Sequence, residues 1–482
     1  MRSFRIYDTE KHMKQHISKA FFLSAVIILG IEFYNNVFGI VEPGFFKSFQ
    51  KDSESLTVGR LYRSGIDGPF SYGGFMGWNH PDSSSLPPNT VIQDARFAGW
   101  GYNVPGYPSK YMYQYDAFQN NFKVGHYEKY YSQCAGQCLV YYMLGSVFHI
   151  SGQRFIDLCR MLNAVFTALI LCIFLWWAFH YFSLFSVVFS FCMILISQWV
   201  IVYASNMLYV PAMFFLPFVV NLIALHYQHE KGTVDMKQIL MLTFLTIFLK
   251  CILVGFDFII PALVMAVMPV FFYAIIDKWA FKRLLSFFLY TSIISLAGVV
   301  LGLLVLMLQL RLYYHSWVLA ADYLVQTSER RTYGNQEDLV HIFKSSRDIP
   351  FSYLFNVYAN GVAVDLRYFA AMFNAGGVQI RFGAFLWVTL FASVCVLLFK
   401  SASKGRRILA LMIVTWISLA GIVGWFVVFK YHSISHTHMN FIIWHMPFLL
   451  FGVLFIGEVI YQYLIQNINF YIGKLQDSRG GK

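Results

Sequence analysis

Three carboxylates follow the first long apolar run, which ends near residue 40: Glu42, Asp52 and Glu54. A carboxylate held at a membrane surface and partly desolvated can have a raised pKa and act as a general base. Such a base activates a sugar or lipid hydroxyl that lies within hydrogen-bonding reach. For any single one of the three, a solvated loop carboxylate is the simpler interpretation, so the hypothesis concerns the group.

Lys250 stands in an apolar run, seven residues before Asp257. A charge within a membrane helix costs about 2.5–3.5 kcal/mol on insertion scales, so a partner or a task is expected. Two interpretations stay open. Lys250 either faces a lipid phosphate, or it pairs with Asp257 on the same helix face or extends to the interface.

Arg154, Asp157 and Arg160 begin another long apolar run. Arg154 and Asp157 can pair at i,i+3, whereas Arg160 points inward. A guanidinium suits a phosphate because its planar donors form two parallel hydrogen bonds. Both arginines are therefore candidate phosphate ligands, with interfacial anchoring as the competing interpretation for Arg154.

The segment 430–440 is the densest polar cluster between two apolar runs, and it contains His432, His436 and His438. Imidazoles can hold a phosphate, move a proton or bind a metal. A zinc site would need a distant fourth ligand, since no Asp or Glu lies beside them. We expect hydrogen-bonding or phosphate contacts, and no cofactor, although a divalent metal stays open.

The composition indicates which kind of element positions these residues. Of the 482 residues, 58% are hydrophobic and 12% are charged, and apolar runs of about twenty residues recur between charged segments. The net charge of +12 comes mostly from Lys and Arg in short loops and tails, without a basic and aromatic stripe. The chain is therefore expected in a lipid bilayer and not on nucleic acid.

We predict an all-α polytopic membrane protein with about ten transmembrane helices and two large external segments. The spans are expected near residues 20–40, 155–181, 184–204, 207–226, 239–255, 258–276, 284–308, 383–399, 408–429 and 441–463. Most of these spans are expected to be uninterrupted. A moderately apolar stretch at 133–150 is too short to span and predicts a helix along the membrane surface.

The spans divide the chain into five parts. These are a cytoplasmic N-terminus with the first span (1–40), an external loop domain with the interfacial helix (41–152), spans two to seven (153–308), a second external segment (309–382), and the last three spans with a cytoplasmic tail (383–482). Every short Lys/Arg-rich loop then lies on the cytoplasmic side, as the positive-inside rule requires. No Asn-X-Ser/Thr sequence occurs, which favours a bacterial inner membrane.

This layout resembles the GT-C class of integral membrane glycosyltransferases, including bacterial serotype-converting glucosyltransferases. The motifs that carry the resemblance are Asp52-Ser53-Glu54, Tyr130-Tyr131-Ser132-Gln133, and His432–Asn440 with Trp444 and Pro447. The layout covers the whole chain: acids after the first helix, a surface helix before the second, and a second long external segment. Ser53 separates two acids that are adjacent in many members of the class.

The resemblance implies transfer of a sugar from a polyprenyl-phosphate carrier to an envelope glycan or glycolipid, such as O-antigen or lipopolysaccharide. A carboxylate of the first loop would deprotonate the acceptor, with Glu54 or Asp52 expected first and Glu42 next. Lys250, Arg160, Arg154, His436 and His438 would hold the donor phosphate. Tyr131, Gln133 and His432 would contact substrate.

Two other functions stay open. An O-antigen polymerase or ligase would depend on arginine and histidine more than on a carboxylate, and Arg330, Arg331, Arg347 and Arg367 supply such residues. A transporter or flippase of lipid-linked glycans would require helices that are broken within the membrane.

Overall fold

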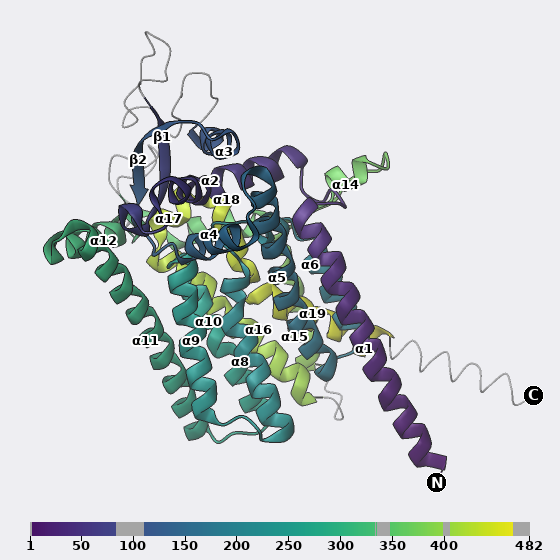
Figure 1. The fold of residues 1–482 in the computed structure, drawn as a ribbon. Helices are drawn as coiled ribbons and strands as arrows, with labels where there is room; N and C mark the ends of the chain where they lie inside the picture. The colour runs from purple at the N-terminus through teal and green to yellow at the C-terminus, as the bar shows by residue number, and fades with distance from the viewer. Residues whose placement is uncertain (1, 83–109, 333, 335–347, 399–404, 466–482) are drawn as a thin grey trace, which may run out of the picture.

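The computed structural model describes residues 2–82, 110–332, 334, 348–398 and 405–465. Long helices pack side by side into a bundle, and a smaller α/β layer covers one end of it (Figure 1). The bundle contains α1 (Arg2–Asn35), α5 (Gly152–Tyr181), α6 (Leu184–Leu195), α7 (Gln198–Ala204), α8 (Ala212–Lys231), α9 (Met236–Val254), α10 (Ile259–Ile276), α11 (Phe281–Tyr314), α15 (Phe382–Leu398), α16 (Gly405–Val428) and α19 (Phe448–Ile460).

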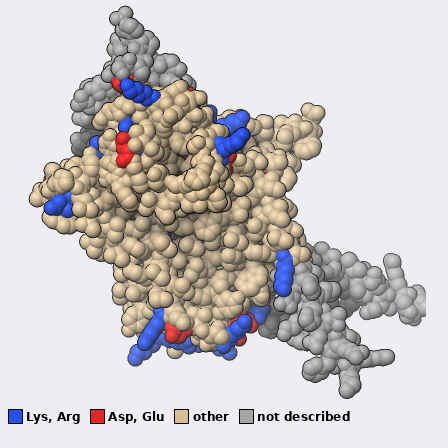
Figure 2. Space-filling view, viewed as in Figure 1, with Lys and Arg blue, Asp and Glu red and all other residues tan. Residues whose placement is uncertain are grey.

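The bundle has the composition of a membrane domain. Within the described residues, six helices are long and apolar enough to cross a membrane, or up to eight if each of two bent helix pairs is one span. In Figure 2 the coloured charged side chains gather at the two ends of the visible face, and the belt between them is almost free of charge. The chain is therefore a helical, polytopic membrane protein. Ten spans remain a prediction, because neither α1 nor α15, which has 17 residues, is among these candidates.

The first predicted span ends earlier than expected. Helix α1 stops at Asn35, and Asn36 takes a positive φ of 48°. The Asn36 amide donates to the Val41 carbonyl at 2.6 Å and accepts from the Val41 N–H at 3.0 Å. These two bonds close a turn that satisfies the backbone and redirects the chain into the cap.

Two of the predicted continuous spans are broken instead. Helices α6 and α7 meet at 66°, and the segment 437–445 meets 448–463 at 46°. Pro447 explains the second break, because proline lacks the N–H that a helix needs. The two breaks touch, since Ser197 Oγ and His445 Nε2 are 2.7 Å apart.

The layer over the bundle end, which we call the cap, consists of α2 (Pro43–Asp67), η1 (Ser71–Gly74), β1 (Met76–Pro81), α3 (Lys110–Asn120), β2 (Val124–Tyr130) and α4 (Gly136–Phe148). Helix α2 begins because Glu42 caps its first N–H groups and Pro43 fits the first turn. Strands β1 and β2 pair antiparallel, with Trp78 opposite Glu128. The predicted surface helix at 133–150 is α4, whose apolar Val147 is 71% exposed.

Short elements from the second half of the chain complete the cap end. They are α12 (Trp317–Thr332), α13 (Phe351–Ala359), β3 (Val362–Asp365), α14 (Arg367–Ala371), β4 (Gln379–Arg381), α17 (Lys430–Ser435), α18 (Thr437–Asn440) and η5 (Phe441–His445). Strands β3 and β4 form a second antiparallel pair. Helix α17 packs against α12, so residues far apart in sequence meet beneath the cap.

Candidate functional site

Asp52 projects from α2 where the cap meets the bundle. Its carboxylate accepts a hydrogen bond from Tyr111 of α3, and burial together with Asp52 raises the pKa of Tyr111 to about 12. The phenol therefore stays protonated and orients the carboxylate. Asp52 also acts electrostatically on the exposed ring of His438 and on the buried Tyr209. Asp52 thus lies near one residue of the predicted histidine segment, His438.

Glu54 has a different environment, although it lies only two residues further along α2. Its side chain is completely buried, and Arg160 Nη2 donates to Glu54 Oε2 at 2.6 Å. Tyr115 donates to the same oxygen at 3.2 Å, and the Met207 N–H donates to Oε1 at 3.0 Å. Both carboxylate oxygens of Glu54 therefore accept hydrogen bonds from the protein itself. The ion pair between Glu54 and Arg160 joins the cap to α5.

Glu42 caps a helix. Its two oxygens accept from the N–H groups of Gly44 at 2.8 Å and Phe45 at 2.6 Å. These hydrogen bonds lower the pKa of Glu42, which makes the carboxylate a weaker base. Among the three predicted carboxylates, Asp52 is therefore the best placed to take a proton.

A buried ion pair lies under the cap, in the turn between α9 and α10. Arg331 Nη1 of α12 donates to Asp257 Oδ1 at 2.6 Å, and Arg331 Nη2 donates to the Tyr130 hydroxyl at 3.1 Å. Burial acts to raise the pKa of Asp257, but the nearby positive charge, that of Arg331 above all, outweighs burial and holds that pKa below its usual value. Asp257 is thus a fixed anion that positions cations around it.

Lys250 shares this site, but it does not bind the Asp257 side chain. Its completely buried amine donates to the backbone carbonyl oxygens of Gly255, at 2.7 Å, and of Asp257. The structure therefore shows neither a salt bridge from Lys250 to the Asp257 carboxylate, which Arg331 binds, nor an amine that extends to the interface, and the phosphate contact of Lys250 remains a prediction. The amine fixes the α9–α10 turn and keeps a positive charge there.

The histidine segment is folded against the same ion pair. The ring centroids of His432 and His436 are 4.9 Å apart, and those of His436 and His438 are 6.4 Å apart. The Asn440 amide holds the turn by donating to the carbonyls of His432 and His436. Burial lowers the pKa of His432 to about 3 and that of His436 to about 4. Both rings are therefore neutral at pH 7.

A metal centre is not indicated by this arrangement. Among the described residues, no group of three or more His, Cys, Asp or Glu side chains has a geometry that could hold a metal ion. The second arginine of α12, Arg330, adds positive charge close to His436 and reaches Ser132 at 3.4 Å. Cationic and neutral donors are thus the main ligands that the site offers.

The segment 130–133 covers this site from the cap. Gln133 is buried against the α9–α10 turn, where a Cβ on Gly255 would meet Gln133 Oε1 at 2.3 Å. Tyr131 packs instead among aromatic rings, with centroid distances of 5.0 Å to Phe75 and to Tyr323. Its predicted substrate contact remains a prediction, and the surrounding rings give it a packing role.

Sequence reasoning missed part of this site. Asp257 was considered only as a partner for Lys250, and Tyr111 and Tyr209 were not singled out. Arg331 was noted only for an alternative function. The signal that could have indicated the pair was the Arg330-Arg331 doublet beside an acid at the end of an apolar run. Arg347 lies outside the described residues, and Arg367 pairs with Asp365 at 2.9 Å.

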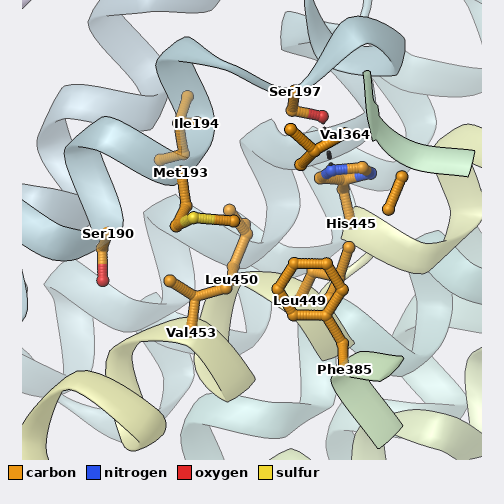
Figure 3. A pocket seen from close by; sticks show the side chains of 11 residues that line it. Ser190, Met193, Ile194, Ser197, Val364, Phe385, His445, Leu449, Leu450 and Val453 are labelled. Atoms are coloured by element: carbon orange, nitrogen blue, oxygen red, sulfur yellow. Dashed lines mark hydrogen bonds between the residues drawn. The ribbon is translucent and has the colours of Figure 1, made fainter. Parts of the chain in front are cut away.

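Arg154 lies apart from the other candidates. It lines a separate cavity together with Asp157 and Tyr34. A second cavity lies at the junction of the two broken helix pairs, where His445 and Ser197 line it among apolar side chains of α6, α15 and α19 (Figure 3). Asp52, Asp257 and the three histidines of 432–438 line neither of these two cavities.

Comparison of the chain with protein-family models, with curated proteins and with solved structures found no match.

Proposed function

We propose that this membrane protein is a glycosyltransferase that moves a sugar from a polyprenyl-phosphate carrier to an envelope glycan on the external face of a bacterial inner membrane. One observation supports the proposal most: the exposed Asp52 lies near His438, and the histidine segment begins in α17, which packs against the helix α12 that carries Arg331 and its ion pair with Asp257. An exposed carboxylate next to a cationic, hydrogen-bonding surface is what displacement of a lipid phosphate requires.

In the proposed step, Asp52 removes the proton of the acceptor hydroxyl. The acceptor oxygen forms a bond to the anomeric carbon, and the bond between that carbon and the phosphate oxygen breaks. The bonding electron pair leaves with the polyprenyl phosphate. Arg330, Arg331 and Lys250 stabilise the developing negative charge, and neutral His436 or His438 donates a hydrogen bond to it.

The charges of the site agree with a phosphorylated substrate. Arg330 and Arg331 carry two positive charges, the Asp257 carboxylate balances one of them, and the buried Lys250 amine lies beside this pair. The remaining surplus belongs to α12, with Lys250 on α9, and the helix α4 packs against α9. A lipid-linked phosphate at the membrane surface would reach this surplus without leaving the bilayer.

The test measures transfer from a polyprenyl-phosphate sugar panel to a lipid-linked glycan by the full chain in nanodiscs. Asp52→Asn is expected to lower the rate about 10²–10⁴-fold, as loss of a general base does. Asp322→Asn is the matched control, because Asp322 is an exposed acid on α12. Full activity of Asp52→Asn would refute the assignment, and loss only in Arg331→Gln would favour the polymerase or ligase.

A second function is favoured by the two broken helix pairs. Transporters use helix breaks within the membrane to form substrate sites, and here the breaks meet through Ser197 and His445. A flippase would move a labelled lipid-linked glycan across vesicle membranes without forming a new glycosidic bond. Movement that survives in Asp52→Asn, without any transfer product, would decide for transport.

A further inference from the structure

The cavity that contains Arg154 lies where three elements meet at the cap end of the bundle. It has a volume of about 590 Å³ and is lined by the end of α1, the link between α4 and α5, and the first turns of α5. This volume falls within the usual range of ligand sites, about 300–1,000 Å³. Tyr34, His149, Ser151, Arg154 and Asp157 form its polar lining, and Met161 belongs to its apolar lining.

The apolar lining continues along α5 towards the middle of the bundle. Met161 is 41% exposed and Val165, one turn further along, is 44% exposed. These side chains face the surroundings of a membrane-spanning helix, which are lipid chains. The cavity therefore joins a polar part at the cap end to an apolar face within the bilayer, as the site of a lipid head group does.

The two charges of the cavity are not neutralised by each other. No ion pair joins Arg154 to Asp157, and among the described residues the Arg154 guanidinium has no hydrogen-bond or ion-pair partner. Asp157 accepts one hydrogen bond, from Gln153 at 2.7 Å to Oδ1, and Oδ2 has none among the described side chains. The nearby Arg160 is already paired with Glu54.

We propose that this cavity binds the head group of a zwitterionic phospholipid with a primary ammonium, the chemistry of phosphatidylethanolamine. Arg154 binds the phosphodiester, for which the guanidinium donates two parallel hydrogen bonds. Asp157 accepts a hydrogen bond from the ammonium. The Tyr34 hydroxyl and the first N–H groups of α5, which Ser151 does not cap, complete the phosphate ligands.

The Asp157 carboxylate discriminates between the lipid head groups that could occupy the cavity. A polyprenyl phosphate or an anionic phosphatidylglycerol would use the charge of Arg154 for its phosphate and bring no cation for the half-buried Asp157, whose carboxylate would then lie beside the negative charge of the lipid. A choline head group carries a positive charge but has no N–H to donate. Only the primary ammonium satisfies Asp157 by both charge and hydrogen bonding.

The test uses native mass spectrometry of the full chain released from nanodiscs that contain equal amounts of ethanolamine, glycerol and choline phospholipids. The wild-type protein is expected to retain one ethanolamine lipid about tenfold better than either of the others. Arg154→Gln should lose that retention, and Asp157→Asn should keep a lipid but lose the choice between head groups. Arg283→Gln, an exposed arginine at the opposite end of the bundle, should retain the lipid as wild type does.

Three outcomes would overturn the proposal. They are equal retention of the three lipids by the wild-type chain, unchanged retention by Arg154→Gln, and displacement of the ethanolamine lipid by added polyprenyl phosphate at equal concentration. The wild-type competition remains decisive if a variant does not fold. Because lipid retention is measured without sugar transfer, the result is independent of the proposed enzymatic function.

Discussion

Glu54 and Arg160 form a contact between residues 106 positions apart in sequence. Glu54→Gln would leave a buried guanidinium without its counter-charge, which costs about 3–5 kcal/mol. We expect a lower thermal midpoint in detergent for this variant. The double variant Glu54→Leu, Arg160→Met should recover most of the loss, since removing both charges also removes their desolvation cost. Equal midpoints for wild type and Glu54→Gln would contradict the structural role.

The buried histidines make stability depend on pH. His432 and His436 have pKa values of about 3 and about 4 in the folded chain, against an ordinary value of 6.5. Above pH 6.5 the rings are neutral in both states and contribute no pH dependence. As the pH falls below 6.5 the unfolded chain binds protons that the folded chain does not, so stability decreases. Thermal midpoints between pH 7.5 and 4.5 should show this fall, and it should be shallower in His432→Gln.

Sequence reasoning at the residue scale identified the right residue types but not their partners. It grouped Asp52 with Glu54 because they are close in the chain, yet helix geometry turns one outwards and buries the other. It placed Lys250 near Asp257, while Arg331, 74 residues further on, takes the carboxylate. Such pairs depend on tertiary packing, and a single sequence does not indicate which distant arginine or lysine will pair with a given carboxylate.

The cap depends on a close approach between α2 and β1. A Cβ on Gly59 would lie 2.2 Å from the Gly77 carbonyl oxygen, which is far inside van der Waals contact. Gly59→Ala should therefore destabilise the cap by about 1–3 kcal/mol or more, by forcing the helix away from the strand. Limited proteolysis of the cap in nanodiscs would detect the change as faster cleavage.

Gly65 provides the control on the same helix. A Cβ there meets no atom within 4 Å, so Gly65→Ala should be neutral or add about 0.5–1 kcal/mol of helix stability. If both variants are cleaved at the same rate, the close contact between α2 and β1 is not what holds the cap.

The apolar runs predicted the positions of the membrane helices well, but they did not predict where two of those helices are broken. The runs at 155–181 and 258–276 match α5 and α10 closely. The break before α19 could have been expected from Pro447, which the sequence shows. The break between α6 and α7 has no proline or glycine, and it is stabilised by contacts that only the fold creates, such as the bonds from Gln198 and Trp199 to the Val362 carbonyl.

For the molecule as a whole, the placement of charge predicts which end faces the cytoplasm. The end of α8, which carries Lys231, and the start of α11, which carries Arg283, lie at the end of the bundle opposite the cap. If the positive-inside rule holds, a cysteine in place of Lys123, on the cap, should react with an impermeant maleimide in intact cells. A cysteine in place of Lys231 should react only after lysis, with the unmodified chain as background. The reverse pattern would invert the orientation of the protein.

The fold class was accessible from composition, because a chain with so few charges cannot cover a soluble surface of this size. The site was only partly accessible. Its cations come from α9 and α12, its anion Asp257 from the turn between α9 and α10, and its histidines from the segment 432–438. They meet because the spans bring these segments to one end. The order of the membrane spans predicts that these segments meet at one end. Which side chains contact each other there depends on packing, and the periodicity of apolar residues carries no information about it.

The ion pair between Glu54 and Arg160 also has a consequence for folding during synthesis, because its two residues leave the ribosome at different times. Because 106 residues separate them, the ribosome delivers the arginine roughly 5–20 s after the glutamate at the usual 5–20 residues per second. During that interval α1 can already be inserted into the membrane, whereas α2, which carries Glu54, still lacks the arginine that joins it to α5. The nascent chain therefore passes through a stage at which Glu54 has no counter-ion and is accessible to the quality-control proteins that act on membrane proteins.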